Sequence, residues 1–489
     1  MNKNKHHNKK RPAVSYKEYV LSLLAMALIA GGGVYAINRD RQQPIVEYLA
    51  SYPDFADLEK VTKTYQEIKD NYVGEIDQDN LIDGAVSGLT QALDDPFSGY
   101  FTGQNADDLD DSISGSFQGI GAVMTIKDKQ VTIAEEPMKD SAAQKAGLKA
   151  GDVITAVDGE EVTDKELTEV VQSIRGEENT EVTLTINRDN ETFDVTLTRS
   201  AIEIDTVKGE LVPSDKKIGH VTINSFSSHT ADEFKKVVED LRKDGAKGFM
   251  FDVRQNPGGL LDQVAIMSSM FLEDGETIVK FEDKTKKKNQ IIAGKDLDDG
   301  FKIFEPAVVL MDSKSASASE IFAAALNQSA DIPLVGETTF GKGTVQTVAP
   351  ISKESDLKLT TSKWLTPKDE WIHEKGIKPT AEIDFKEYDD LKIISTEQTY
   401  QLGMSGSSLQ NINHLLALLG YNVTADDEQF TEATAAAVRE LQTTQGLPVT
   451  GIIDKETALK IQQLIAEKII SDNRVVDKGI ELISSKLAQ

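Results

Sequence analysis

The sequence has 489 residues, of which 39% are hydrophobic and 27% are charged, as in a globular protein of roughly three or four domains. Its formal net charge of −28 argues against a nucleic-acid partner, because phosphate binding requires clustered lysines and arginines. The sequence contains no cysteine, which excludes disulfides, thiolate metal sites and cysteine nucleophiles.

The N-terminal segment predicts export and a membrane anchor. Residues 19–37 carry no charge and come close to the ~20 residues that span a bilayer. Residues 1–18 are basic, and a basic flank stays in the cytoplasm. We therefore expect a cell-membrane protein that crosses the bilayer once and has the bulk of its chain outside the cell. A cleaved signal peptide is the alternative, because residues 34–36 (VYA) fit the small-x-small cleavage rule.

The following segments differ in their periodicity. Residues 51–103 have apolar residues three or four apart and predict helices, whereas residues 112–200 have the alternation and glycine turns of short strands. Strands then alternate with helices from residue 218 to about 383, which predicts an α/β core. After a polar connector at 386–403, the last 85 or so residues read as short amphipathic helices.

A serine cluster lies where an apolar strand meets an alanine-rich helix. The strand is expected at 306–312 and the helix from about residue 321, so Ser317 lies at the helix start. Unpaired backbone N–H groups and the helix dipole can stabilise a developing oxyanion there. A purely structural alternative exists, because Ser317 and Glu320 also fit a capping box.

A lysine between two glycines follows the next predicted strand, at 333–337. Glycine lets the backbone turn tightly and approach other groups, so Lys342 can be directed inward. Burial can lower the pKa of a lysine by the roughly three units that a general base needs. Gln346 could hold the amine by a hydrogen bond without adding charge.

Other chemistry fits the sequence less well. No histidine has an obvious carboxylate partner, and the serines lack a Gly-x-Ser-x-Gly elbow. His373-Glu374 lacks the second histidine of a zinc helix, so neither a metal nor a cofactor is expected.

Oxyanion donors are available at Gly258 and Gly259, where a predicted strand turns into a helix, although such a turn is equally common without catalysis.

Three segments together resemble the carboxy-terminal processing (tail-specific) serine peptidase family: DVRQNPGG at 252–259, SASASEI at 315–321 and ETTFGKGTVQ at 337–346. The resemblance covers about residues 55–385. It implies Ser317 as nucleophile, Lys342 as base, Gln346 as the residue that orients the base, and the N–H groups of Ala318 and of Gly258 or Gly259 as oxyanion donors. One departure is Thr380, where the family often has aspartate.

Two flanking domains also resemble known families. Residues 112–200 resemble a PDZ domain, in which Phe117-Gln118-Gly119-Ile120-Gly121 matches the loop that binds a terminal carboxylate. Arg175 matches an arginine that gates the active site in this family, and we expect it to couple tail binding to the alignment of Lys342. A structural β-module without a ligand is the alternative. Residues 404–466 resemble a three-helix peptidoglycan-binding domain, with a spacer or autoinhibitory part as the alternative to wall docking.

The expected fold is multidomain α+β, with a transmembrane helix, a helical segment, a β-sandwich-like PDZ domain, an α/β (ClpP/crotonase-like) peptidase core and a small helical C-terminal module.

The expected partners are proteins with exposed C-termini, cell-wall peptidoglycan, the membrane and a second copy of the chain, for which residues 51–103 and 466–489 are candidate contact surfaces. The rival interpretation is a non-catalytic scaffold that binds protein tails and the cell wall. The expected parts are 1–18, 19–37, 50–111, 112–200, 201–385, 386–403, 404–466 and a helical tail of unassigned role, 467–489.

Overall fold

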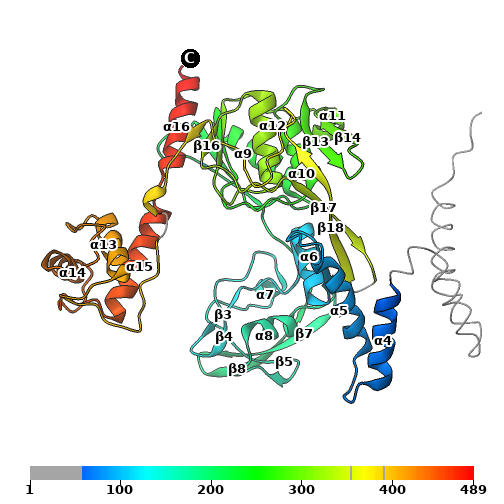
Figure 1. Cartoon of the computed structure of the whole chain (residues 1–489), viewed down its shortest axis with the longest axis horizontal. Coiled ribbons are helices and arrows are strands. Elements are labelled where there is room, and N and C mark those ends of the chain that lie inside the picture. Colours follow the sequence, from blue (N-terminus) through cyan, green and yellow to red (C-terminus); the bar gives the residue numbers. More distant parts are fainter. Residues whose placement is uncertain (1–57, 353–354, 389–390) are drawn as a thin grey trace, which may run out of the picture. The chain divides into compact units, whose positions relative to one another are not determined.

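The computed structural model describes residues 58–352, 355–388 and 391–489 (Figure 1). Within these ranges, no helix is both long enough and apolar enough to cross a membrane. The anchor expected at 19–37 and the alternative cleavage site lie outside the described residues. The chain divides into two compact units, residues 1–94 and 95–489.

The described part of the first unit is a pair of helices, α4 (Glu59–Asn71) and α5 (Gln78–Gln91). The carboxylate of Asp77 caps α5 by accepting the backbone N–H groups of its first turn. None of the α4 side chains is buried. Of the segment predicted to be helical, 51–103, two parts are helices, whereas Gly99–Thr102 forms a strand, β1.

A six-stranded sheet forms the centre of the second unit. Its strand order is β10 (Val207–Leu211), β11 (Ile218–Ile223), β12 (Gly248–Asp252), β15 (Ala307–Met311), β16 (Leu334–Gly336) and β19 (Ala381–Glu382). All neighbours except β10 and β11 are parallel. Continuous apolar runs such as β15 are typical of parallel strands that are covered on both faces.

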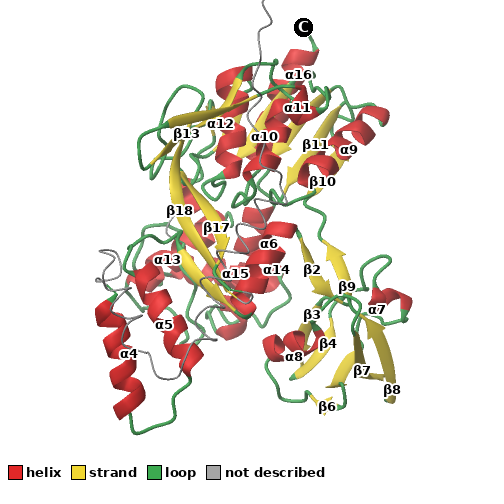
Figure 2. Cartoon of the chain, turned by 90° about the vertical axis from the view of Figure 1, so that its right-hand side faces the viewer, coloured by secondary structure: helices red, strands yellow, loops and turns green. Residues whose placement is uncertain are grey.

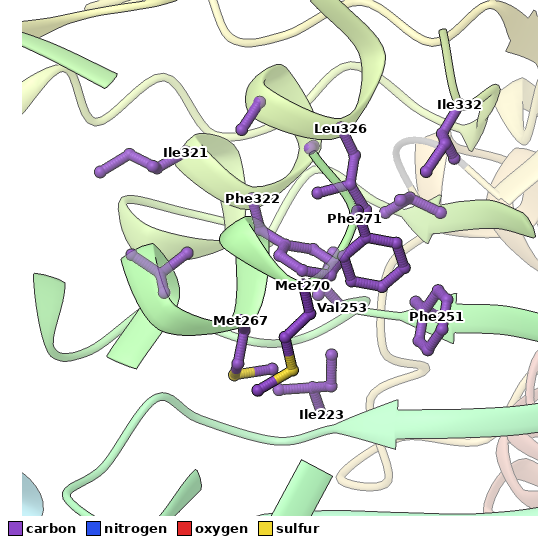
Figure 3. Close-up of a cluster of buried hydrophobic side chains, with 14 of the residues drawn as sticks. Ile223, Phe251, Val253, Met267, Met270, Phe271, Ile321, Phe322, Leu326 and Ile332 are labelled. Carbon is purple, nitrogen blue, oxygen red and sulfur yellow. The ribbon is translucent and has the colours of Figure 1, made fainter. Parts of the chain in front are cut away.

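Helices α9 (Thr230–Lys243), α10 (Leu261–Ser269) and α12 (Ala318–Ala330) contribute the core on one face of this sheet. Figure 3 shows Phe251 of β12 close to Phe271 and to Phe322 of α12. The Phe251 and Phe271 rings meet edge to face at 4.9 Å between centroids, and Phe271 meets Phe322 at 5.7 Å. This packing fixes the start of α12, and therefore Ser317, relative to the sheet.

The last helix, α16 (Arg474–Leu487), covers the opposite face. Because side chains alternate along a strand, Met250 and Leu310 point away from the aromatic core and form a second cluster with Val475 and Ile483 of α16. Gly479 allows the close approach, since a Cβ there would lie 2.8 Å from the Met250 sulfur. The tail that had no assigned role is thus part of the α/β core.

A second sheet carries the segment that follows Lys342. Its path is β1 (Gly99–Thr102), β18 (Ser355–Leu365), β13 (Thr277–Asp283) and β14 (Lys288–Ile292), and β17 (Thr344–Pro350) pairs with β18. Figure 2 shows β17 and β18 as a long hairpin. Short helices α6 (Gln104–Ser114) and α11 (Lys295–Asp298) complete this part.

The PDZ-like domain has its own core. Its sheet runs β3 (Met124–Lys127), β4 (Gln130–Ile133), β5 (Val153–Val157), β7 (Glu181–Arg188) and β8 (Glu191–Thr198), with β6 (Glu160–Glu161) beside β5. Helices α7 (Ala142–Lys145) and α8 (Leu167–Ile174) pack on it, and β2 (Ser116–Gly119) pairs separately with β9 (Ser200–Glu203). Strand β3 is an edge strand, so one side of its backbone is open for an added strand.

The C-terminal module consists of α13 (Ser407–Leu418), α14 (Glu432–Thr444) and α15 (Lys455–Ile470) around one apolar cluster. Leu409 and Leu416 are buried in it, as the helical period predicts. Thr431 and Asp454 cap α14 and α15. The expected three-helix module is therefore present.

The two ends of this module meet at a set of residues that we call the clasp: Asp384, Glu387, Tyr388, Asp472 and Arg474. The hydroxyl of Tyr388 donates to Asp472 at 2.9 Å, and Arg474 donates to Glu387, Asp472 and the carbonyl of Asp384. The Arg474 hydrogen bonds lower the pKa of Asp472 to about 2. The clasp therefore joins the chain before the module (the 3-10 turn Lys386–Tyr388) to the start of α16.

Candidate active site

Ser317 occupies the N-terminus of α12 in a backbone conformation that few non-glycine residues adopt, with φ 55° and ψ −112°. Such strain costs about 1–3 kcal/mol and persists only where the surroundings enforce it. Glu320 enforces it by accepting the backbone N–H of Ser317 at 2.8 Å. The carboxylate half of the predicted capping box is therefore present.

The Glu320 carboxylate also holds the segment that contains Lys342. It accepts the N–H groups of Gly341 at 2.7 Å and Lys342 at 2.8 Å, and the hydroxyl of Thr339 at 2.6 Å. Burial raises the pKa of Glu320, although these hydrogen bonds oppose the rise. A single buried side chain therefore ties the serine turn to the lysine loop. Sequence reasoning treated Glu320 only as a cap, because these partners are distant in the sequence.

The Lys342 amine is partly buried beside an aromatic ring. Its Nζ lies 5.0 Å from the centroid of Phe97. Burial, and repulsion from Lys358, lower the pKa of Lys342 to about 8, against the opposing effects of Glu320 and Asp95. An amine with this pKa is neutral in a useful fraction of molecules near neutral pH, as a general base must be.

Gln346 lies two residues into β17, and its side-chain amide donates to the hydroxyls of Thr344 and Thr360, each at 3.1 Å. The hydrogen bonds of the described residues do not include one between Gln346 and the Lys342 amine. The orienting role of Gln346 stays a prediction.

The Asn256–Gly259 turn lies directly against the serine turn. Gly258 has φ 105°, and a Cβ there would lie 2.8 Å from the Ser317 Cβ and 2.9 Å from the Ala318 nitrogen. The Gly258 N–H donates to the side chain of Asn256 at 2.8 Å. Among the hydrogen bonds of the described part of the chain, the N–H groups of Ala318 and Gly259 have no partner. The two groups are therefore available to a ligand oxygen.

A buried ion-pair cluster lies immediately before this turn. Asp252 accepts from Arg254 at 2.7 Å and contacts the His220 ring nitrogen at 2.9 Å. Burial alone would raise the pKa of Asp252, but its His220 and Arg254 partners lower it. Asp312, at the end of β15, accepts the backbone N–H of Gln255 at 3.0 Å. These carboxylates hold the turn against the strand ends.

The residues predicted to bind a substrate tail lie at the start of the PDZ-like domain. Phe117, Gln118 and Gly119 belong to β2, where they pair with β9, and Ile120 and Gly121 follow the strand. In the hydrogen bonds described for this domain, the backbone N–H groups of Ile120 and Gly121 have no partner.

Arg175 ends α8 and links this domain to α6. Its guanidinium donates to Asp108 at 3.3 Å and Asp111 at 3.0 Å, and it lies 5.5 Å from the centroid of the Phe117 ring. The C-terminal end of α6 contacts the core, because the Ser228 hydroxyl donates to the carbonyl of Ile113 at 3.2 Å. Helix α6, which Arg175 contacts, therefore also contacts the segment that precedes α9.

In the described ranges, no group of three or more His, Asp or Glu residues could hold a metal ion.

Family models match four parts of the chain: peptidase family S41 at residues 217–383, a PDZ domain at 133–188, the CtpB activating-protease N-terminal domain at 28–104 and a peptidoglycan-binding domain at 405–461. The fold and these matches define a serine-type C-terminal processing peptidase with accessory PDZ and peptidoglycan-binding domains.

The chain belongs to the carboxy-terminal processing peptidases of family S41. It is 38% identical over 431 residues to the carboxy-terminal processing protease CtpA of Bacillus subtilis (strain 168), which covers 88% of this chain and 91% of that protein. A CtpA-like serine protease of Staphylococcus aureus (strain MW2) is 38% identical over 430 residues, covering 88% and 86%. The solved photosystem II D1 C-terminal processing protease is 28% identical, covering 69% of this chain and 88% of that one, with a TM-score of 0.40.

Proposed function

We propose that this peptidase cuts proteins by a Ser317–Lys342 mechanism. The observation that supports the assignment is the Glu320 carboxylate, which holds the backbone of both residues while burial brings the pKa of Lys342 to about 8. The neutral Lys342 amine takes the proton of the Ser317 hydroxyl as Oγ attacks the scissile carbonyl carbon. The resulting lysinium then donates that proton to the leaving amine as the C–N bond breaks. Water, activated by the same amine, then hydrolyses the ester bond between the substrate's acyl group and Ser317 Oγ.

The N–H groups of Ala318 and Gly259 stabilise the oxyanion in this mechanism. Both N–H groups lack a partner within the described residues. The Gly258 N–H, in contrast, donates to the Asn256 side chain, and Gly258 is needed because a Cβ there would collide with Ser317. The role of Gln346 is to hold the Lys342 amine by a hydrogen bond when substrate is bound. The Gln346 side-chain amide then has to break its hydrogen bonds to Thr344 and Thr360.

The PDZ domain selects substrates by their C-terminal residues in this proposal. The terminal carboxylate binds the N–H groups around Ile120 and Gly121, and the tail adds as a strand to β3. Arg175 carries the signal of an occupied domain through α6 to the alignment of Lys342. Replacing Arg175 by alanine should therefore change both tail dependence and basal cleavage. The coupling is refuted if neither changes.

The remaining assignments place the enzyme at the cell surface. Residues 19–37 anchor the chain in the membrane once and the rest lies outside the cell, with domain limits as predicted from the sequence. Residues 404–466 dock on the peptidoglycan of the wall, supported by the family match at 405–461. Retention of this part of the chain on insoluble wall material tests the docking, and its complete elution with the unbound fraction would contradict it.

The mechanism is tested with casein and a tail-tagged protein as substrates for the wild type, Ser317→Ala and Lys342→Ala. Both variants should lose cleavage while keeping the wild-type melting temperature. Cleavage by Ser317→Ala at the wild-type rate would refute the mechanism. The rival role, a scaffold that binds tails and wall, requires that the wild type itself leave both substrates intact.

A further inference from the structure

The segment from Trp371 to Gly376 encloses the loop that carries Lys342. Gly341 has φ 90°, and a Cβ there would lie 2.9 Å from the backbone nitrogens of Lys375 and Gly376. A Cβ on Gly343 would lie 2.8 Å from the backbone nitrogen of His373 and 2.9 Å from the indole nitrogen of Trp371. The two glycines beside the lysine are thus explained by the close approach of this segment.

The same segment satisfies the backbone of the loop. The Gly343 N–H donates to His373 Nδ1 at 3.3 Å, and the Trp371 indole N–H donates to the Gly343 carbonyl at 3.0 Å. The Glu374 N–H donates to the Gly341 carbonyl at 2.8 Å. Trp364 of β18 donates its indole N–H to the Lys342 carbonyl at 2.7 Å. With the two Glu320 bonds, every backbone N–H and carbonyl of Gly341-Lys342-Gly343 has a partner.

Aromatic packing holds the His373 imidazole in this role. The ring stacks on Trp371 at 5.3 Å between centroids with an interplanar angle of 19°, and Phe97 meets it edge-on at 6.3 Å. Phe97 is also the ring that faces the Lys342 amine. For Nδ1 to accept the Gly343 N–H, the imidazole proton has to be on Nε2.

We propose that His373 is a positioning residue of the active site, which fixes the Lys342 backbone through its Nδ1 acceptor while Trp371 holds the adjoining carbonyl. The inference rests on the proposed Ser317–Lys342 mechanism and deepens it. Without the acceptor, the Gly343 N–H loses its partner, and the Lys342–Gly343 peptide is held only through its carbonyl, by Trp364. The Lys342 side chain is then oriented less firmly for the proposed proton transfer from Ser317. Small misplacements of a catalytic group lower the rate of the chemical step more than they weaken substrate binding.

The test compares His373→Ala with His373→Asn, whose side-chain oxygen can replace Nδ1 as the acceptor. We measure kcat and KM with a tail-tagged substrate, together with the melting temperature. His373→Ala should lower kcat by about 10- to 100-fold with KM changed less than about threefold. His373→Asn should recover most of that loss. His229→Ala, at an exposed histidine before α9, is the matched control and should leave kcat unchanged.

Two results would overturn the inference: an unchanged kcat in His373→Ala, or equal losses in the Ala and Asn variants when both are folded. If His373→Ala does not fold, His373→Phe decides, because it keeps an aromatic ring against Trp371 but removes the Nδ1 acceptor of the Gly343 N–H. An unchanged kcat in that variant overturns the inference as well. Ser317→Ala is assayed alongside. If it still cleaves, the mechanism itself has failed, whereas an inactive Ser317→Ala beside an active His373→Ala refutes only the role of His373.

Discussion

Phe97→Leu should lower the pKa of Lys342 and move the pH profile of the enzyme to lower pH. The Phe97 ring attracts the protonated Lys342 amine across 5.0 Å and so stabilises the charged form. Such a contact contributes about 1 kcal/mol at a partly desolvated amine, which corresponds to about 0.7 pKa units. From a value of about 8 in the wild type, removal of the ring lowers the pKa of Lys342 to about 7.3.

The sign of the pH dependence follows from the role of Lys342 as a base. Activity requires the neutral amine, so kcat/KM rises with pH and levels off above the pKa. At pH 7 the neutral fraction is about 9% for a pKa of about 8 and about one third after the substitution, a roughly threefold to fourfold gain. The plateau should fall, because a weaker base accepts the proton less readily and because the Phe97 ring no longer packs edge-on against His373.

The assay is a profile of kcat/KM against pH, from about 6 to 10, for the wild type, Phe97→Leu and Phe304→Leu. Phe304 is 77% exposed and is a matched control that should leave the midpoint unchanged. A midpoint in Phe97→Leu that stays at the wild-type value, or moves up, would refute the reasoning, provided that the variant melts at the wild-type temperature.

Two further predictions concern buried contacts. Glu320→Gln keeps one acceptor oxygen but presents an NH2 group to N–H donors at the other position, so at least one of the Gly341, Lys342 and Ser317 N–H groups loses its partner. We expect the free energy of unfolding in urea to fall by about 2–4 kcal/mol and kcat to fall at least tenfold, and wild-type values of both would contradict the role of the carboxylate. Ile483→Ala removes a buried side chain of α16 and should cost about 2–4 kcal/mol in the same urea titration, whereas Ile470→Ala, at a position 82% exposed, should cost less than about 0.5 kcal/mol. Equal effects of the two substitutions would show that α16 does not stabilise the core.

The sequence pattern predicts the local elements of this protein well. The strand expected at 306–312 contains β15, and the strand expected at 333–337 contains β16, each with one extra residue at each end. Ser317 lies at the N-terminus of α12, as expected, although the helix begins at Ala318 and not at about residue 321. Lys342 follows β16, as expected. These features depend on runs of apolar residues and on glycine, which are visible within a short window of sequence.

The parts that were missed depend on contacts between distant segments. From the sequence, His373 is considered only as a zinc ligand, because nothing near it in the sequence indicates that its ring lies against Gly343. Glu320 was seen as a cap for the same reason. Helix α16 was left without a role, although its apolar residues at 475 and 483 lie on one helical face. A helix with such a face has to pack on something, and that signal could have been used.

The clasp has a practical consequence for dissecting this enzyme. Since Tyr388 and Asp472 are hydrogen-bonded to each other, the C-terminal module is inserted into the peptidase like a loop between two points that touch. A stop codon placed after the module would delete α16 and expose Met250, Leu310 and their neighbours to water. A free-standing catalytic fragment therefore calls for internal excision of about residues 391–470, with a short glycine bridge joining the cut ends and the final helix left in place.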